Sequence, residues 1–457
     1  MKNDAKRMKT SVLWFSLLLG FSLLPAGARA ESLRAGVARI DVTPTQPVML
    51  AGYAERKHPF AGIHDPLSAR ALAFDEDGAR LVLVSLDTCG LYNHSAESFR
   101  KAILEASGLK PSELFLCATH NHSAPALAFD SYGAALHDED THAAPAQTRD
   151  PAPGASPNAE YTLQLQSNLV TVVRAALSNL TLVRIGSGSG ASPVGVSRRV
   201  PVTDSSGRAT TKFGRNPEGV VDHEVQVLEI VRAEAAGGAQ AGEVAAVLFA
   251  YPSHSTALAA YNNMVTGDLH GMAAQFLDRY LGKGEVTLPF AGASGDIDPF
   301  VRRNGFYTNN GWVPESVLLS TLLGEEVALV LDKVPATVTR CSIKTAFKTV
   351  DLPGKPRGGS SSAETPTVPF NITVARLGDI AFVGFGGEMF NEFGRTIKTE
   401  SPFHPTFVLT HCNGAAGYFP TQASFPAGGY EVGASRCAPG AGEQIVAQAL
   451  QMLKELQ

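Results

Sequence analysis

Apolar residues along the chain form short continuous runs, separated by longer stretches in which they recur every three or four positions. Short runs without alternation are typical of strands that are buried on both faces of a sheet. Such runs lie at residues 80–87, 114–118, 225–231, 245–251, 287–291, 370–377, 379–385 and 407–410, and a further strand is predicted at 341–352. The chain is therefore expected to contain a large and mostly buried β core.

Several of the stretches between these runs have helical periodicity. Residues 95–108 start with Ser95 as a candidate cap, place Phe99 and later apolar residues on one face, and end at Gly108. A strand, a helix and a second strand thus follow one another within residues 80–118, which is a βαβ pattern. We expect an α/β fold with a mixed β-sheet core and flanking helices, in a single large domain, because no repeat or clear linker divides the chain. Further helices are predicted at residues 161–180, 271–281, 313–334 and 443–456.

The first 30 residues have the pattern of a secretory signal peptide. Basic residues precede an apolar segment at 11–24, and Ala28-Arg29-Ala30 fits the small-x-small cleavage rule. The apolar segment is short for a bilayer span, and no later stretch is apolar for long enough to be one. We expect residues 1–30 to be removed and residues 31–457 to be secreted or periplasmic, without an integral membrane segment. An uncleaved anchor is the alternative.

Three segments without periodicity are predicted to be loops, at residues 126–158, 186–199 and 354–367. The 186–199 segment, GSGSGASPVGVSRR, lacks the spacing and the setting of a phosphate-binding loop. Residues 48–71 combine many turn residues with His, Arg and Tyr, which is typical of a structured loop beside a site.

Titratable side chains directly follow several of the predicted strands. In open α/β sheets, ligands bind beyond the carboxyl ends of the strands, so these side chains are expected to meet at one edge. They are Asp87, His120, His122, His254, Asp296, Asp298 and Glu388, together with the loop residue Tyr418.

The two histidines of THNHS, residues 119–123, are two positions apart and therefore share a face of an extended chain. In that arrangement one histidine can bind a metal while the other faces substrate. Catalytic zinc takes about three N or O ligands from the protein and keeps one position open, so two histidines and a carboxylate suffice. Each residue alone is better explained as a turn cap or a packed histidine, but the whole set favours a metal site.

Composition narrows the function further. The chain has 457 residues, of which 44% are hydrophobic, and a formal net charge of −5. An acidic chain without a basic tract is a poor nucleic-acid binder, so no nucleic-acid partner is expected. Five cysteines occur without a CxxC pair, which argues against a thiolate zinc site. Cys89 and Cys117 adjoin apolar strands as buried thiols, whereas Cys412 and Cys437 flank a Gly-rich loop and could be bridged in an oxidising compartment.

Several short segments occur in a specific order along most of the chain, and in that order they resemble one known family. They are GVARIDVTP at 36–44, LAGY at 50–53, GIHDPLSARA at 62–71, ATHNHS at 118–123, residues 216–225, the strand end at His254 with TGD at 266–268, GDIDP at 295–299, Gly387-Glu388, and Gly417-Tyr418 followed by GYE at 429–431. The family they resemble is the neutral/alkaline non-lysosomal ceramidase superfamily.

This resemblance implies a single zinc ion that is bound by two histidines, a glutamate and a tyrosine. Carried over by motif, the implied zinc ligands are His120, His254, Glu388 and Tyr418. His122 corresponds to the residue that assists at the substrate carbonyl. The family cleaves the amide bond between a fatty acid and a sphingoid base.

Two features depart from the family pattern. Asp298 stands where the family's GDxSP motif has a serine, and an ionised carboxylate cannot donate a hydrogen bond as a hydroxyl does. Family members also continue into a C-terminal immunoglobulin-like domain, whereas this chain ends shortly after the Tyr418 loop. Contacts with the substrate are therefore expected to differ from those in a ceramidase.

We therefore expect a zinc-dependent hydrolase in which zinc-bound water cleaves a carbon–nitrogen amide bond of a small or lipid-like substrate. His122 is expected to shuttle a proton or stabilise the oxyanion, and Asp298 to orient water or substrate. Ceramide is not expected to be an efficient substrate, because the 126–158 segment is mostly small and polar. The alternatives are a zinc hydrolase of acylated sugars, esters or glycosides, and a non-catalytic binding protein of the same fold.

Overall fold

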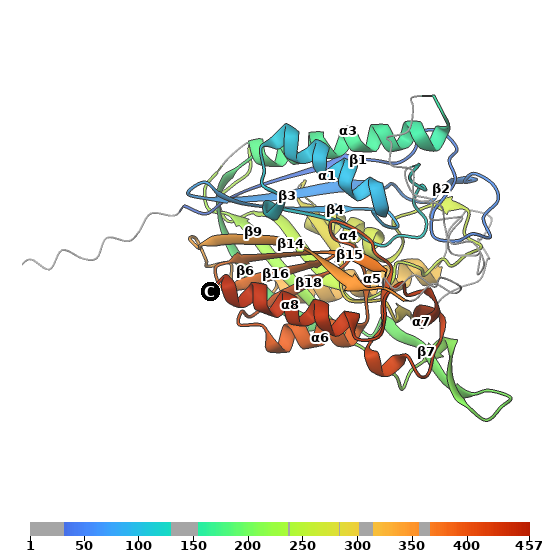
Figure 1. Ribbon diagram of the computed structural model, residues 1–457. Coiled ribbons are helices and arrows are strands. Elements are labelled where there is room, and N and C mark those ends of the chain that lie inside the picture. The colour runs from blue at the N-terminus through green and yellow to red at the C-terminus, as the bar shows by residue number, and fades with distance from the viewer. Residues whose placement is uncertain (1–31, 129–153, 236–237, 283, 301–313, 356–365) are drawn as a thin grey trace, which may run out of the picture. The chain divides into compact units, whose positions relative to one another are not determined.

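The computed structural model describes residues 32–128, 154–235, 238–282, 284–300, 314–355 and 366–457 (Figure 1). Residues from Ser32 to Gln457 form one compact unit. The expected signal peptide at 1–30, most of the 126–158 segment and most of the 354–367 segment lie outside the described residues. No helix in the described part of the chain is long and apolar enough to cross a bilayer.

An eight-stranded mixed sheet contains the first half of the predicted strands. Neighbouring strands are antiparallel except for two parallel pairs, β10–β12 and β4–β5. The middle of the sheet is weakly joined, since β1 and β6 pair only through Arg34 with Leu182 and Ala35 with Thr181. The order across the sheet is β12 (Val286–Ala291), β10 (Val244–Tyr251), β9 (Glu224–Arg232), β6 (Thr181–Ala191), β1 (Arg34–Asp41), β3 (Ser68–Glu76), β4 (Ala79–Leu86) and β5 (Leu114–Ala118).

A four-stranded sheet packs against the first one. Its last two strands, β16 and β18, are a third parallel pair. The core between the two sheets contains Phe115, Leu248 and Phe382, all fully buried. Burying one such side chain contributes about 1.5–3 kcal/mol, so this shared core holds the two sheets together. The strand order is β14 (Ile343–Pro353), β15 (Thr367–Leu377), β16 (Ile380–Phe385) and β18 (Thr406–Leu409).

Helices cover the outer faces of both sheets, which gives four layers in the order helix, sheet, sheet, helix (Figure 1). On the eight-stranded sheet, α1 (Asn93–Ser107) and α3 (Pro157–Ser178) cover one half, and α4 (Asp268–Leu281) and α5 (Pro314–Leu331) cover the other. On the four-stranded sheet lie α6 (Asn391–Glu400) and α8 (Ala441–Glu455). The predicted α/β fold with a mixed β core and flanking helices is confirmed.

Short elements connect these layers near the strand ends. A three-stranded sheet has the order β13-β7-β8, and two further two-stranded sheets pair β2 with β11 and β17 with β19. Their bounds are β13 (Ile297–Pro299), β7 (Gly195–Thr203), β8 (Ala209–Asn216), β2 (Gly62–Ile63), β11 (Met264–Val265), β17 (Glu388–Met389) and β19 (Tyr418–Phe419), and the remaining short helices are η1 (Pro111–Glu113), η2 (Gln422–Ser424) and α7 (Tyr430–Ala434).

The prediction of a loop at 186–199 is wrong, because β6 and β7 occupy most of that segment. Gly186 and Gly188 of β6 face the end of α5 and the segment that follows it. A Cβ atom at Gly186 would lie 2.6 Å from the carbonyl oxygen of Pro335, and one at Gly188 would lie 2.6 Å from Val334. Glycine therefore serves here to let the helical layer approach the strand closely, which periodicity cannot reveal.

Candidate active site

The carboxyl ends of the three parallel strand pairs in the two large sheets, β10–β12, β4–β5 and β16–β18, meet at one place. A parallel bridge joins Asn121, just after β5, to Ser255, just after β10. The backbone N–H of Thr410, after β18, donates to the carbonyl of Ala291 at the end of β12, at 2.9 Å. Segments that are far apart in the sequence are thus held beside one another by backbone hydrogen bonds.

Two buried histidines and a buried glutamate form the centre of this region, and we call them the histidine cluster: His120, His254 and Glu388. The Nε2 atom of His120 lies 3.4 Å from Oε2 of Glu388, and that of His254 lies 3.3 Å from the same oxygen. Their relative exposures are 0%, 0% and 2%. Charged and polar side chains are rarely buried this completely without partners, so the arrangement requires a specific explanation.

Backbone carbonyls determine which nitrogen of each histidine carries a proton. Nδ1 of His120 lies 2.7 Å from the carbonyl oxygen of Cys89, and Nδ1 of His254 lies 2.9 Å from that of Ser294. A carbonyl oxygen only accepts, so both Nδ1 atoms donate, and in the neutral rings both Nε2 atoms present lone pairs. Two lone pairs therefore face the carboxylate oxygen of Glu388.

This arrangement requires positive charge between the three side chains. A proton on Nε2 of His120 is one source of this positive charge. Burial alone would lower the pKa of His120, but the Glu388 carboxylate and the Cys89 carbonyl outweigh burial and raise the pKa to about 10. A divalent cation held by the two Nε2 atoms and Oε2 supplies the other. Oε2 of Glu388 is buried and accepts no hydrogen bond among the described residues, which fits a metal ligand.

His122 lies beside this cluster without belonging to it. Its Nε2 atom is 3.2 Å from Nε2 of His120, and its Nδ1 atom is buried with no hydrogen-bond partner in the described part of the chain. Burial lowers the pKa of His122 well below its usual value, and the neighbouring His120 and His254 lower it further, so its ring is neutral. A neutral buried imidazole with a lone nitrogen can accept a proton or direct one.

The 48–71 segment, expected to be a structured loop beside a site, packs against His122. The ring of Tyr53 meets the His122 ring edge to face at 5.0 Å. Gly52 has a φ of +91°, and a Cβ atom there would lie 2.5 Å from Cγ of His122, so only glycine allows this approach. Arg56 donates to the backbone carbonyl of His122. The segment therefore forms the wall behind His122.

His411 is a residue of this site that sequence reasoning missed. The His411 ring stacks on the His120 ring with 3.9 Å between centroids. One potential ligand atom from each of His120, Glu388 and His411 lies within 4.8 Å of the other two, so the three side chains could bind one metal ion. The Nδ1 atom of His411 is buried and has no hydrogen-bond partner among the described residues. Both His120 and His411 have positive φ, a strained conformation for a non-glycine residue that tends to occur at functional sites. Its position after the strand at 407–410 is the signal that could have identified it.

A second group of buried charges adjoins the first, and we call it the arginine cluster: Arg198, Asp298 and Glu431. Nη1 of Arg198 lies 3.1 Å from Oδ1 of Asp298, and its Nε donates to Oε1 of Glu431 at 2.7 Å. The same Nη1 lies 3.1 Å from Nε2 of His254, which joins the two clusters. Burial lowers the pKa of Arg198, but Tyr418, Asp298 and Glu431 outweigh burial and raise it well above its usual value.

Arg198 and Glu431 were also missed as site residues, although both lie in segments singled out earlier. Arg198 lies on β7, which the sequence did not predict as a strand, and Glu431 is the second residue of a short helix, α7. The register β13–β7 places Asp298 opposite Val196, two residues before Arg198. Strand pairing thus explains why Asp298 reaches the arginine.

Tyr418 lies next to the glutamate of the histidine cluster. Strands β17 and β19 are parallel and place Tyr418 opposite Glu388 in register. The Tyr418 ring lies 5.6 Å from that of Tyr430, and Cζ of Arg198 lies 5.5 Å from the Tyr418 ring centre. The predicted site residues His120, His122, His254, Asp298, Glu388 and Tyr418 therefore come together at the strand ends.

Two other strand-end carboxylates have structural partners instead. Asp87 pairs with Arg70, a fully buried arginine, at 3.0 Å. Asp296 accepts hydrogen bonds from the backbone and side-chain nitrogens of Asn391, both at 2.8 Å. Burial raises the pKa of Asp87, and it also raises that of Asp296 to about 6. Both residues support the strand ends from behind the site.

The cysteines differ from the expected pairing. All five are free thiols, and Cys412 does not face Cys437. Cys412 lies opposite Cys117 across an isolated β-bridge, whereas Cys437 lies opposite Gly354. The cysteine that lies opposite Cys412 is therefore Cys117, and the suggested Cys412–Cys437 bridge is absent from the structure.

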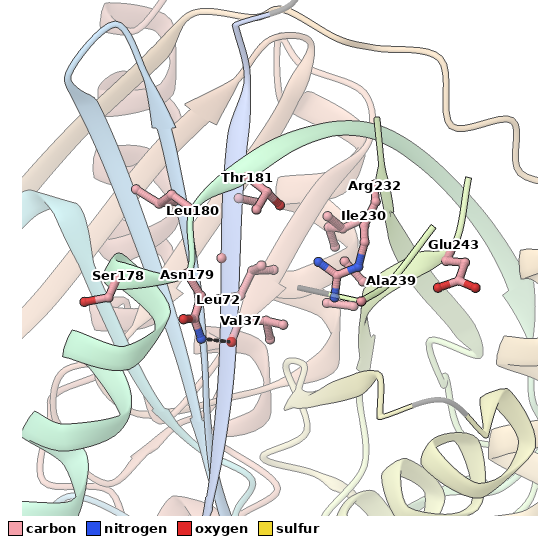
Figure 2. Close-up of a pocket in the computed structure, with 15 residues that line it drawn as sticks. Val37, Leu72, Ser178, Asn179, Leu180, Thr181, Ile230, Arg232, Ala239 and Glu243 are labelled. Atoms are coloured by element: carbon pink, nitrogen blue, oxygen red, sulfur yellow. Dashed lines mark hydrogen bonds between the residues drawn. The ribbon is translucent and has the colours of Figure 1, made fainter. Parts of the chain in front are cut away.

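A cavity of about 630 Å³ lies at the opposite end of the eight-stranded sheet (Figure 2). It fills the gap where β1 and β6 separate, with Asn179 donating to the carbonyl of Val37. Its wall includes Ala245 at the start of β10; that strand ends at Tyr251, roughly 20 Å away at 3.3 Å per residue, and His254 lies beyond its end. The cavity contains no histidine, so the candidate chemistry lies at the other edge.

Part of the sequence and the overall fold both resemble those of known proteins. Residues 33–139 match the sequence model of the N-terminal part of neutral/alkaline non-lysosomal ceramidases. The fold resembles the crystal structure of neutral ceramidase from Pseudomonas aeruginosa, with a TM-score of 0.71 and 18% identity, over 94% of this chain and 75% of that one. It also resembles a structure described as a ceramidase complexed with C2, with a TM-score of 0.70 and 17% identity, over 93% and 75% of the two chains.

No curated protein matches the sequence significantly. At 17–18% identity the structural likeness by itself shows the shared fold, while the sequence match covers the segment that carries His120 and His122. The matched segment resembles the N-terminal part of the neutral/alkaline non-lysosomal ceramidases, and the structural likeness shows that this chain shares the fold of those two structures.

Proposed function

We propose that this protein is a secreted or periplasmic zinc-dependent hydrolase that cleaves the amide bond of an N-acyl compound. The observation that carries the proposal is the histidine cluster. Two imidazoles, each with Nδ1 bound to a backbone carbonyl, direct Nε2 at one buried carboxylate oxygen. Outer hydrogen bonds of this kind orient the histidine ligands of metal sites.

The proposed zinc ligands are His120, His254 and Glu388, with Tyr418 from the paired strand. Bound zinc lowers the pKa of a coordinated water and polarises a carbonyl, which is the chemistry that amide hydrolysis needs. Nitrogen and oxygen donors suit zinc as a borderline metal. Nη1 of Arg198, which already donates to Asp298, lies 3.1 Å from Nε2 of His254, so a bound ion would take the place of Arg198 as the partner of that lone pair.

His122 is proposed to act on the substrate. Its neutral ring adjoins the cluster but is not held by a backbone carbonyl through Nδ1, so it is free to hydrogen bond with the scissile carbonyl or to move a proton to the leaving amine. Nη2 of Arg198 is buried and has no hydrogen-bond partner among the described residues, so it can donate to an oxygen of the substrate, at the side where three aromatic rings surround the guanidinium.

The proposed substrate is a soluble N-acyl amine in preference to a long-chain ceramide. Asp298, at the position of the family's serine, is committed to a buried ion pair with Arg198 and cannot donate a hydrogen bond when ionised. A lipid substrate needs an apolar groove, because each buried CH₂ is worth about 0.8 kcal/mol. The wall at this side contains two arginines and a glutamate, Arg198, Arg199 and Glu431.

The experiment combines metal analysis with a substrate panel. Protein purified without added metal is expected to contain one zinc ion per chain by elemental analysis and to hydrolyse an N-acyl amine, with activity lost on chelation and restored by zinc. Retention of another metal in place of zinc would overturn the zinc assignment. A zinc-loaded, folded protein that hydrolyses no amide, ester or glycoside would instead indicate a binding protein.

A further inference from the structure

Cys117 and Cys412 lie directly opposite each other between two strands that come from distant parts of the chain. The N–H of Ala118 donates to the carbonyl of His411 at 3.2 Å, and the N–H of Asn413 donates to that of Leu116 at 2.8 Å. These two hydrogen bonds flank the pair Cys117–Cys412, which is therefore a non-hydrogen-bonded antiparallel pair.

Such a position suits a disulfide bond. Residues of a non-hydrogen-bonded pair have Cα atoms about 4.5 Å apart and side chains on the same face. Disulfides span Cα separations of about 4.4–6.8 Å, so the backbone already allows the bond. Both cysteines are buried and lie in the core between the two sheets.

The other three cysteines have different surroundings. Cys437 lies opposite Gly354, Cys341 packs against Gly378, and the sulfur of Cys89 lies 4.0 Å from the hydroxyl of Tyr92. The pairing of Cys412 with Cys117 is thus specific, and it is not the pairing that proximity in the sequence suggested.

We propose that Cys117 and Cys412 form a disulfide bond in the mature protein, linking the end of β5 to the segment after β18. In this step both thiols lose a proton and an electron and the S–S bond forms. A disulfide of glutathione or of a dithiol oxidoreductase accepts the two electrons and two protons through a mixed disulfide and leaves as thiols. Burial raises the pKa of the Cys117 thiol well above its usual value, so the exchange takes place during folding, before the pair is enclosed.

The bond joins the two segments that carry His120 and His411. Cys117 precedes His120 by three residues, and Cys412 directly follows His411. Both histidines have positive φ, so their loops are held away from relaxed conformations. A covalent link beside them restrains these loops and also closes a long loop of chain, which removes conformational freedom from the unfolded state.

The test uses the full chain refolded with a glutathione redox couple, followed by alkylation of free thiols and digestion without reductant. Mass spectrometry is expected to find the Cys117 and Cys412 peptides linked, and Cys89, Cys341 and Cys437 alkylated. Reduction is expected to lower the Tm by about 5 °C. Cys412 linked to Cys437, or Cys117 and Cys412 both alkylated, would overturn the proposal.

Two variants make the test specific. Cys117→Ser is expected to remove the linked peptide and to make the Tm insensitive to reductant, and the matched control Cys437→Ser is expected to keep both properties of the wild type. If Cys117→Ser fails to fold, the comparison of oxidised and reduced wild-type protein still decides the outcome. Retention of a reductant-dependent Tm in a folded Cys117→Ser protein would contradict the assignment.

Discussion

The histidine cluster and the arginine cluster are adjacent and equally buried, but they are held in place by different kinds of partner. His120 and His254 are oriented by carbonyl oxygens of the backbone at 2.7–3.0 Å. Arg198 is oriented by the carboxylates of Asp298 and Glu431. Backbone partners remain when a side chain is replaced, whereas side-chain partners are themselves mutable and charged.

This difference determines how each cluster should respond to substitution. Removing a histidine from the first cluster leaves the framework intact and removes a single ligand. Removing the arginine from the second leaves two carboxylates in a buried position without their shared partner, which is costly. Function should therefore fail before stability in the histidine cluster, and stability should fail together with function in the arginine cluster.

The largest expected effect is loss of the proposed metal ligands. His120→Ala and His254→Ala should each reduce the zinc content to near zero and lower kcat/KM by at least about 10⁴-fold, because metal-assisted hydrolysis then has no metal. The exposed His58→Ala serves as the control and should retain both. Normal zinc content in either ligand variant would show that the ligand assignment is wrong.

His122→Ala should separate metal binding from turnover within the same cluster. We expect it to retain one zinc ion and to lose about 10²–10⁴-fold in kcat, which is the usual contribution of a general acid or base. Elemental analysis and steady-state kinetics on the same sample measure both quantities. Zinc loss equal to that of His120→Ala would identify His122 as a ligand.

The arginine cluster should respond in stability. Arg198→Met should lower the free energy of unfolding by about 3–5 kcal/mol, because it leaves Asp298 and Glu431 buried without this partner. Arg208→Met, at an exposed arginine, is the control and should change the stability by less than about 0.5 kcal/mol. Denaturant titration of the two variants measures the difference, and similar values for both would remove the contrast between the clusters.

His411 tests how far the histidine cluster extends. His411→Phe keeps a ring that can stack on His120 but removes both nitrogens, and we expect it to weaken zinc binding about 10–100-fold. Competition with a chromogenic chelator gives the affinity directly. An unchanged zinc affinity would show that His411 contributes packing alone.

The smallest expected effect concerns substrate choice. Asp298→Ser places a hydroxyl at the position where the family has a serine and removes the carboxylate that holds Arg198. We expect the ratio of kcat/KM for a long-chain ceramide to that for a soluble N-acyl amine to rise about tenfold, or about 1.4 kcal/mol. A wild-type protein that already prefers ceramide would contradict the proposed role of Asp298.

The sequence by itself determined the elements of this protein and the residue types at the strand ends. Buried runs such as 114–118 and 245–251 became β5 and β10 almost unchanged, because a continuous apolar run has few alternatives to a buried strand. The histidines and the glutamate that follow strands were also visible, because position after a strand is a local property. Their roles as ligands remain predictions.

Only the tertiary structure decided which of these residues meet and in what chemical form. Arg198 and Glu431 are 233 residues apart, and Cys117 and Cys412 meet through a bridge that neither flanking segment specifies. The tautomers of His120 and His254 depend on carbonyls from other segments, which no local pattern reveals. The strand β6 was wrongly predicted to be a loop for the same reason. Its glycines allow the segment after α5 to pack closely against the strand, and that contact exists only in the folded chain.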